Sequence, residues 1–187
     1  MIDDKYEPLT IQSLPQRLKT IPELTALVGT DTNSWKVEEV GDGNLNLVFI
    51  VKSLAGSAIV KQALPYVRLV GDSWPLPLYR AYFEYHALTR QASRAKGTVP
   101  KIYYFNNDQA MIIMEYLAPH KILREKLILG EKVENLADTL GEFCANTAFR
   151  GSDLSLDTAE VKSDRALFSG NVAIPAITEG LVFCDPY

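Results

Sequence analysis

A glycine turn and a lysine that follows it are the residues most suited to chemistry in this sequence. Gly41, Gly43 and Asn44 lie between two stretches of strand-forming residues. Glycine permits φ > 0 and leaves no Cβ between backbone and ligand, so the N–H groups of such a turn can face a phosphate. A second short strand, at 57–62, then places Lys61 at the end of an apolar run. This order of turn, strand and lysine is typical of a lobe that binds a nucleotide.

A simpler interpretation of the same residues remains open. A Gly-Asp-Gly-Asn turn between two strands also fits a plain β-hairpin, and Lys61 alone fits a solvated surface lysine. The Walker pattern is absent, and no helix follows the turn as a Rossmann glycine fingerprint requires. The elements that follow must therefore decide between a phosphate site and a hairpin.

Glu84 is the next candidate, because a helix is expected at about 78–95. Helical spacing puts Glu84 on one face with Ala81, Leu88 and Ala92, on or beside the packed side. A carboxylate there needs a partner, and a lysine on the adjacent strand is the obvious one. The alternative is that Glu84 borders this face and is solvated.

The remaining pattern predicts the elements around these residues. Capping signals at Ser13 and Thr20 predict two short helices, the second ending near Gly29. Residues 63–77, rich in proline, are expected to be irregular, and Cys144 to be a small core residue of a helix. Strands are predicted at 35–40, 45–53, 57–62, 101–105 and 110–114, and further helices at 120–129, 133–147 and 156–167. A shift in composition predicts one domain at 1–117 and the beginning of a second at 118–187.

Composition excludes several classes of protein. The chain has 187 residues, of which 47% are hydrophobic and 22% charged, enough to bury a core. A net charge of −4 argues against nucleic acid as a partner. Two cysteines and two histidines predict neither a disulfide framework nor a metal centre. No apolar stretch has membrane-spanning length and no signal-peptide pattern is present, so the expectation is a cytoplasmic protein without a membrane partner.

The order of these elements resembles the protein-kinase-like fold. That fold predicts an α+β structure: an antiparallel β-sheet in an N-terminal lobe with a glutamate-bearing helix, followed by the first helices of a mainly helical C-terminal lobe. Asn46 stands where protein kinases have a third glycine, which is more similar to the aminoglycoside phosphotransferase branch. The 5-methylthioribose kinases resemble the chain more specifically. The segments that carry this resemblance are 8–10, 39–49, 60–68, 73–76, 80–84 and 114–117.

The resemblance implies a function and a set of site residues. It implies ATP- and Mg²⁺-dependent phosphorylation of the anomeric (1-) hydroxyl of 5-methylthioribose in methionine salvage, by a homodimer. Lys61, steadied by Glu84, would pair with the phosphates. The residues that would cover the triphosphate are Gly41, Asp42, Gly43, Asn44 and Asn46. The residues of the expected adenine-binding hinge are Met114, Glu115, Tyr116 and Leu117.

The chain also departs from the family pattern. No His-Gly-Asp-type catalytic loop and no Asp-containing metal motif occurs before Tyr187, so no catalytic or metal-binding residue is assigned. We therefore expect a truncated chain that alone has no appreciable kinase activity. Two alternatives remain: an aminoglycoside- or choline-kinase-like phosphotransferase for another alcohol, or a nucleotide-binding module without catalysis.

Overall fold

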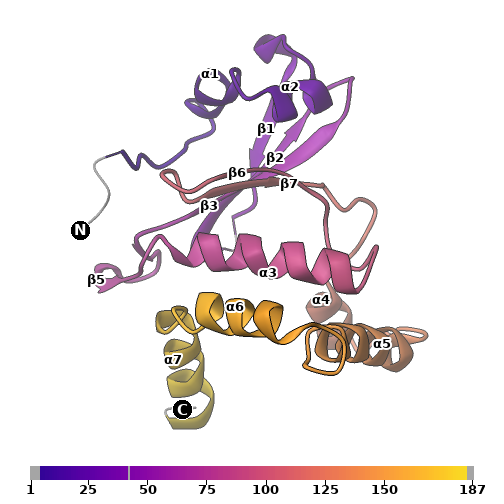
Figure 1. The fold of residues 1–187 in the computed structure, drawn as a ribbon. Helices are drawn as coiled ribbons and strands as arrows, with labels where there is room; N and C mark the ends of the chain where they lie inside the picture. Colours follow the sequence, from indigo (N-terminus) through magenta and orange to yellow (C-terminus); the bar gives the residue numbers. More distant parts are fainter. Residues whose placement is uncertain (1–4, 42, 185–187) are drawn as a thin grey trace.

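The computed structural model describes residues 5–41 and 43–184 and has an antiparallel β-sheet at its centre (Figure 1). The sheet has five strands in the order β1-β2-β3-β7-β6. Its strands are β1 (Lys36–Glu39), β2 (Asn46–Lys52), β3 (Ser57–Ala63), β6 (Ile102–Asn106) and β7 (Met111–Met114). Helix α3 (Arg80–Arg94) connects β3 to β6 by way of a small hairpin, and it runs along the sheet. The predicted α+β fold with an antiparallel sheet and a glutamate-bearing helix is confirmed.

Alternation of side chains makes β2 and β3 the centre of the core. Phe49, Val51, Ala58 and Val60 are fully buried, while their neighbours along each strand are less so. On this face lie helices α1 (Leu14–Leu18) and α2 (Pro22–Val28), which contribute buried leucines and a valine. The alternation thus fixes which side chains of β3 face α1 and α2 and which face the opposite side.

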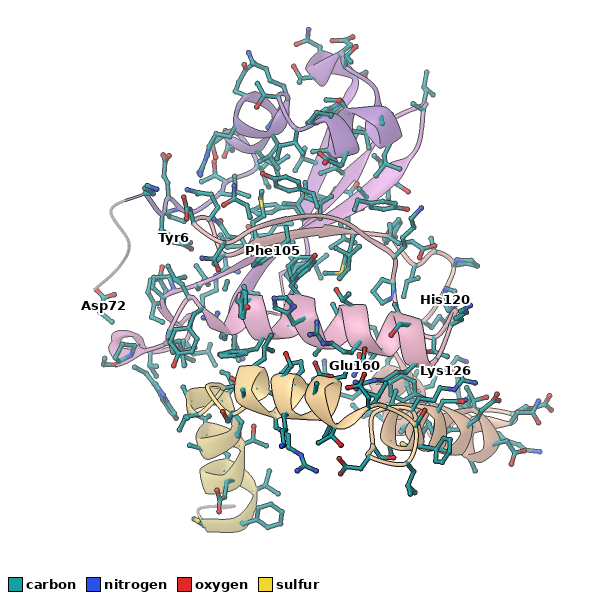
Figure 2. All side chains as sticks on the ribbon, viewed as in Figure 1. Tyr6, Asp72, Phe105, His120, Lys126 and Glu160 are labelled. Carbon is teal, nitrogen blue, oxygen red and sulfur yellow. The ribbon has the colours of Figure 1, made fainter. Side chains whose placement is uncertain are left out.

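Aromatic packing seats α3 against the sheet. The ring of Tyr85 stacks on Phe105 of β6, with centroids 4.5 Å apart, and Tyr82 contacts the same ring at 6.4 Å. Figure 2 shows Phe105 between the sheet and the helix. The helix therefore follows β6 on one side and leaves its opposite side to the second half of the chain.

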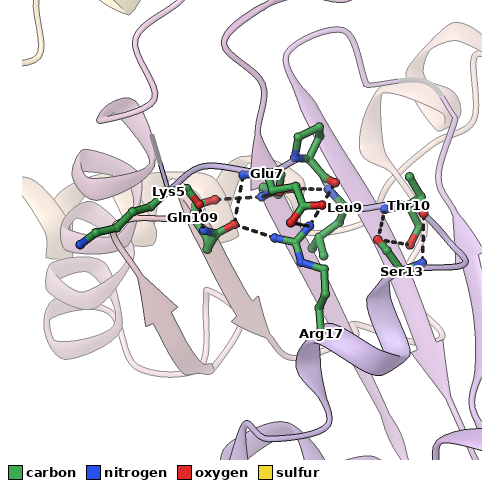
Figure 3. A network of polar contacts seen from close by, with 9 residues as sticks. Lys5, Glu7, Leu9, Thr10, Ser13, Arg17 and Gln109 are labelled. Carbon is green, nitrogen blue, oxygen red and sulfur yellow. Dashed lines mark hydrogen bonds and ion pairs between the residues drawn. The ribbon is translucent and has the colours of Figure 1, made fainter. Parts of the chain in front are cut away.

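The N-terminal segment is bound to the sheet by two glutamines (Figure 3). Gln62, fully buried on β3, accepts from the Leu9 N–H at 2.7 Å and donates to the Gln109 carbonyl at 3.0 Å. Gln109 itself accepts from Arg17 at 2.7 Å and donates to the Lys5 carbonyl. The bonds to Leu9, Arg17 and Lys5 join residues more than fifty positions apart, so the segment before α1 is held against the sheet.

The turns show which capping predictions hold. Gly29 ends α2 at the predicted position with φ = 82°, but its ψ of 163° differs from the left-handed (αL) cap that we expected there. Ser13 is the N-cap residue of α1, as predicted, but its hydroxyl accepts from the Thr10 N–H and makes no capping bond to the helix. The predicted cap at Thr20 is wrong, because Ile21 occupies the N-cap of α2. Gly56, between β2 and β3, lies so close to α2 that a Cβ there would be 2.7 Å from the Leu27 carbonyl.

Two predictions about packing and secondary structure are also wrong. The segment 63–77 is not irregular throughout, since β4 (Tyr66–Val67) and β5 (Gly71–Pro75) pair as a small antiparallel hairpin. Cys144 is exposed rather than buried, because no residue of its helix is buried. Apolar periodicity marks a face but cannot say whether another element covers it.

The second half of the chain is helical. Its elements are α4 (Leu123–Ile128), α5 (Leu136–Phe149), α6 (Thr158–Phe168), α7 (Ala173–Glu179) and the π-helical turn η2 (Gly180–Cys184). Asp157 caps α6 by accepting from the Glu160 N–H at 2.9 Å. Among the described residues, no single helix is long and apolar enough to cross a membrane. Only the helices Thr158–Phe168 and Ala173–Cys184 taken as a pair, with a bend of 72° between them, have that length and composition.

Candidate nucleotide-binding site

The lysine and the glutamate predicted from the sequence form an ion pair. Lys61 Nζ lies 2.5 Å from Glu84 Oε1, with the two side chains 24% and 34% exposed. Successive side chains of a strand point to opposite faces of the sheet. Because Gln62 points to the N-terminal segment, its neighbour Lys61 points to the other face, where α3 lies. The Lys61 side chain is thus tied to Glu84 and still partly exposed.

The glycine turn lies beside this pair. Asn46, at the end of the turn, is paired with Ala63, two residues beyond Lys61, and the Leu64 N–H donates to the Leu45 carbonyl at 3.0 Å. A Cβ on Gly43 would be 2.8 Å from the Asn46 carbonyl oxygen, whereas one on Gly41 would meet nothing within 4 Å. Gly43 is therefore required by the turn itself. Gly41 borders open space, and Asp42 lies outside the described residues.

Arg80 connects the turn to helix α3, a role that the sequence did not reveal. Arg80 as a residue is 8% exposed, and its guanidinium donates to the carbonyl of Leu64 at 2.7 Å and to that of Leu45. Burial lowers the pKa of Arg80, and the carboxylate of Glu84 acts in the opposite direction. Because its partners are mainly backbone carbonyls, no local sequence pattern could identify it. One turn later on the same helix comes Glu84.

Arg68 braces the other side of the turn. Its backbone N–H donates to the Asn44 carbonyl at 2.7 Å, and its guanidinium lies 2.7 Å from the Glu39 carboxylate. Glu39 ends the strand before the turn, so Arg68 contacts both the strand that enters the turn and the turn itself. The region from the β4–β5 hairpin to α3 thus holds the glycine turn on two sides.

The predicted hinge follows β7 at the opposite end of the site. Met114, 8% exposed, pairs with Ile59 of β3, and the Glu115 N–H donates to the Lys101 carbonyl at 2.8 Å. Tyr116 lies under the ammonium of Lys52, 5.0 Å from the ring centroid. Within residues 5–41 and 43–184, no hydrogen bond engages the carbonyl of Glu115 or the N–H of Leu117. One acceptor and one donor of the hinge are therefore available to the edge of a base.

These parts suit an elongated anionic ligand. The glycine turn lies at the Ala63 end of β3 and the hinge at the Ile59 end, so the two are about 14 Å apart along the strand, at about 3.4 Å per residue. Lys61 lies between them. A nucleotide fits this arrangement, with its base at the hinge and its phosphates at Lys61 and the turn. The described residues contain no group of three His, Cys, Asp or Glu side chains that could bind a metal ion.

Comparison with known proteins agrees with this arrangement. The chain is 44% identical over 187 residues to a methylthioribose kinase of Escherichia coli, covering 100% of this chain and 45% of that protein. It is 43% identical over 183 residues to methylthioribose kinase 2 of Oryza sativa, covering 97% of this chain and 43% of the relative. The resemblance to methylthioribose kinases is confirmed. A Geobacillus methylthioribose kinase is also 44% identical, over 97% of this chain and 44% of its own length.

The match covers nearly all of this chain but only part of each relative. The chain spans slightly less than half the length of the curated methylthioribose kinases that it matches. No family model matches it. The comparisons support the protein-kinase-like fold, while the division of the chain at residue 117 and the roles of the site residues stay predictions.

Proposed function

We propose that this chain is the nucleotide-binding part of an ATP-dependent kinase that phosphorylates the 1-hydroxyl of 5-methylthioribose. The observation that carries the proposal is the Lys61–Glu84 ion pair between the glycine turn and the hinge. The names of the relatives supply the substrate. The reaction would belong to methionine salvage, in the cytoplasm.

Each part of the site has a role in this proposal. ATP would supply the phosphoryl group, and Mg²⁺ would neutralise part of its charge. The backbone of Gly41–Asn46 and the ammonium of Lys61 would orient the phosphates, and Glu84 would keep the lysine extended toward them. Glu115, Tyr116 and Leu117 would bind the adenine edge, with Met114 behind them. Phosphoryl transfer asks the protein mainly for positioning and electrostatic stabilisation, which such groups provide.

The described residues do not offer a complete active site. They include no cluster suited to Mg²⁺, and the sequence has no catalytic-loop motif. We therefore propose that residues 1–187 alone bind nucleotide but have no appreciable kinase activity. Sugar-dependent release of ADP by this 187-residue chain would contradict that proposal. The natural protein is further proposed to act as a homodimer.

The test is ADP release by the natural polypeptide in its full length, with MgATP and a panel of acceptors. The panel contains 5-methylthioribose, ribose, choline and an aminoglycoside, and the Lys61→Ala variant is the control. Turnover with 5-methylthioribose alone, lost in the variant, is the expected result. Turnover with another alcohol would assign a different acceptor. Binding of ATP without turnover on any acceptor would favour a non-catalytic module.

A further inference from the structure

Helix α3 is held on its outer side by one carboxylate that binds two arginines. Asp164 of α6 accepts from Arg90 at 2.9 Å through Oδ1 and from Arg94 at 2.6 Å through Oδ2. The three side chains are only 19–27% exposed. Figure 1 shows α6 running along the side of α3 that faces away from the sheet. We call these three residues the α3–α6 clamp.

The electrostatics of the clamp favour the charged form of Asp164. Burial alone would raise the pKa of this carboxyl, but the hydrogen bonds and positive charges of Arg90 and Arg94 outweigh burial and leave the pKa below its usual range. Charge-assisted bonds of this kind are stronger than bonds between neutral groups. The clamp therefore differs from an ordinary surface ion pair.

Neighbouring residues enclose both arginines. The guanidinium of Arg90 lies 5.8 Å from the ring of Phe168 and 3.0 Å from Nδ1 of His86. The carbonyl of Arg94 accepts from Arg150, and a Cβ on Gly151 would lie 2.7 Å from the Arg94 guanidinium. A Cβ there would also lie 2.9 Å from the Thr147 carbonyl oxygen, so residue 151 has no room for a side chain. The arginines lie four residues apart, on one face of α3.

Glu84 lies between two polar attachments of α3, Arg80 and the clamp, and beside the packing of Tyr85 on Phe105. Arg80, one turn before Glu84, binds the Leu45 carbonyl at the glycine turn. The clamp begins at Arg90, about 9 Å beyond Glu84 along the helix axis at 1.5 Å per residue. A helix moves largely as a rigid rod, so freeing its clamped end lets it tilt about the contacts that remain, Arg80 and the stack of Tyr85 on Phe105. Such a tilt would move Glu84 relative to Lys61, because Glu84 stands on the helix and Lys61 on strand β3 of the sheet.

We propose that Asp164 is a positioning residue, which acts through α3 to keep Glu84 against Lys61 and so orients the lysine toward the nucleotide phosphates. This inference rests on the proposed function, since it presumes that Lys61 binds ATP. The inference goes beyond the proposed function because it assigns an effect on the nucleotide site to a residue in the helical half of the chain. Asp164 itself would touch neither nucleotide nor acceptor.

The test is a double-mutant cycle in the full-length natural polypeptide. Asp164→Asn keeps the shape of the side chain and removes its charge. We expect it to weaken MgATP binding by roughly three- to tenfold, the size usual for a residue coupled through a structural network. In a Lys61→Ala background, the same substitution should have almost no effect on MgATP affinity. Asp153→Asn is the matched control, because Asp153 pairs with Arg165 at 3.0 Å in an exposed position of the same region.

Each outcome bears on the proposal. Unchanged MgATP affinity of Asp164→Asn would overturn it. An equal loss in the wild-type and Lys61→Ala backgrounds would also overturn it, because a merely structural effect does not depend on Lys61. If Asp164→Asn fails to fold, Arg94→Gln, which removes one of the two charged donors to Asp164, must show the same dependence on Lys61 or the proposal fails. A wild-type protein that binds no nucleotide would refute the proposed function, and this inference with it.

Discussion

Gly41 and Gly43 are expected to respond differently to the same substitution, although they stand two positions apart. An alanine Cβ at Gly43 would lie 2.8 Å from the Asn46 carbonyl oxygen, so the turn must open by about 0.6 Å to reach an ordinary contact of 3.4 Å. Overpacking of this kind costs roughly 1–3 kcal/mol. Gly43→Ala should therefore lower the free energy of unfolding by about that amount, with or without nucleotide.

Gly41→Ala should instead leave the unliganded protein unchanged. Its Cβ would meet nothing within 4 Å, and the backbone at Gly41 does not have a positive φ. If phosphates lie against this turn, the added methyl group meets the ligand rather than the protein. We expect MgATP affinity to fall about tenfold, so the stabilisation by saturating MgATP should shrink by about 1.4 kcal/mol.

Thermal unfolding with and without MgATP, together with titration calorimetry, separates the two effects. Gly141→Ala, another open position but on α5 away from the site, is the control and should leave MgATP affinity unchanged. Wild-type MgATP affinity in Gly41→Ala would refute the placement of phosphates at the turn. Unchanged stability of Gly43→Ala would refute the steric argument.

Three further predictions concern the fold that supports the site. Gln62→Leu leaves the buried Leu9 N–H without its acceptor and should lower the free energy of unfolding by about 2–4 kcal/mol in urea, whereas the exposed Gln12→Leu should have little effect. Gly56→Ala should cost about 1–3 kcal/mol in the same measurement, because the Leu27 carbonyl occupies the space. Burial raises the pKa of Tyr6 to about 12, so the folded state retains its proton more tightly than the unfolded state, whose tyrosine pKa is about 10. The stability from Tyr6 should be complete below pH 10 and disappear toward pH 12, and Tyr6→Phe should flatten this part of the stability profile; an equal slope in both proteins would contradict the assignment.

The sequence revealed the parts of the site whose signals are local. Alternation located β2 and β3, and helical spacing placed Glu84 on the side of α3 from which it reaches Lys61. Arg80 escaped prediction because its acceptors are backbone carbonyls sixteen and thirty-five positions away. Asp164 escaped it because its partners lie seventy and seventy-four positions earlier, on an element with no pattern that points to α6.

Packing between elements could not be predicted in the same way. The spacing of apolar residues in α5 is helical, as expected, yet its face is not buried in the structure. Prolines concealed the β4–β5 hairpin, since proline is unfavourable in central strands but is accepted at the edge position that Pro75 occupies. Period and propensity report on a segment alone, whereas burial depends on what another segment brings to it.

The connectivity of the sheet has a consequence for synthesis on the ribosome. Strand β3 pairs with β7, and the N-terminal segment binds both Gln62 and Gln109. The segment before α1 therefore cannot complete its bonds until about a hundred more residues have been translated, which takes roughly 5–20 s at 5–20 residues per second. During that interval the apolar faces of α1 and α2 have no finished sheet to cover. A nascent chain paused before residue 111 should be the species that chaperones bind most strongly.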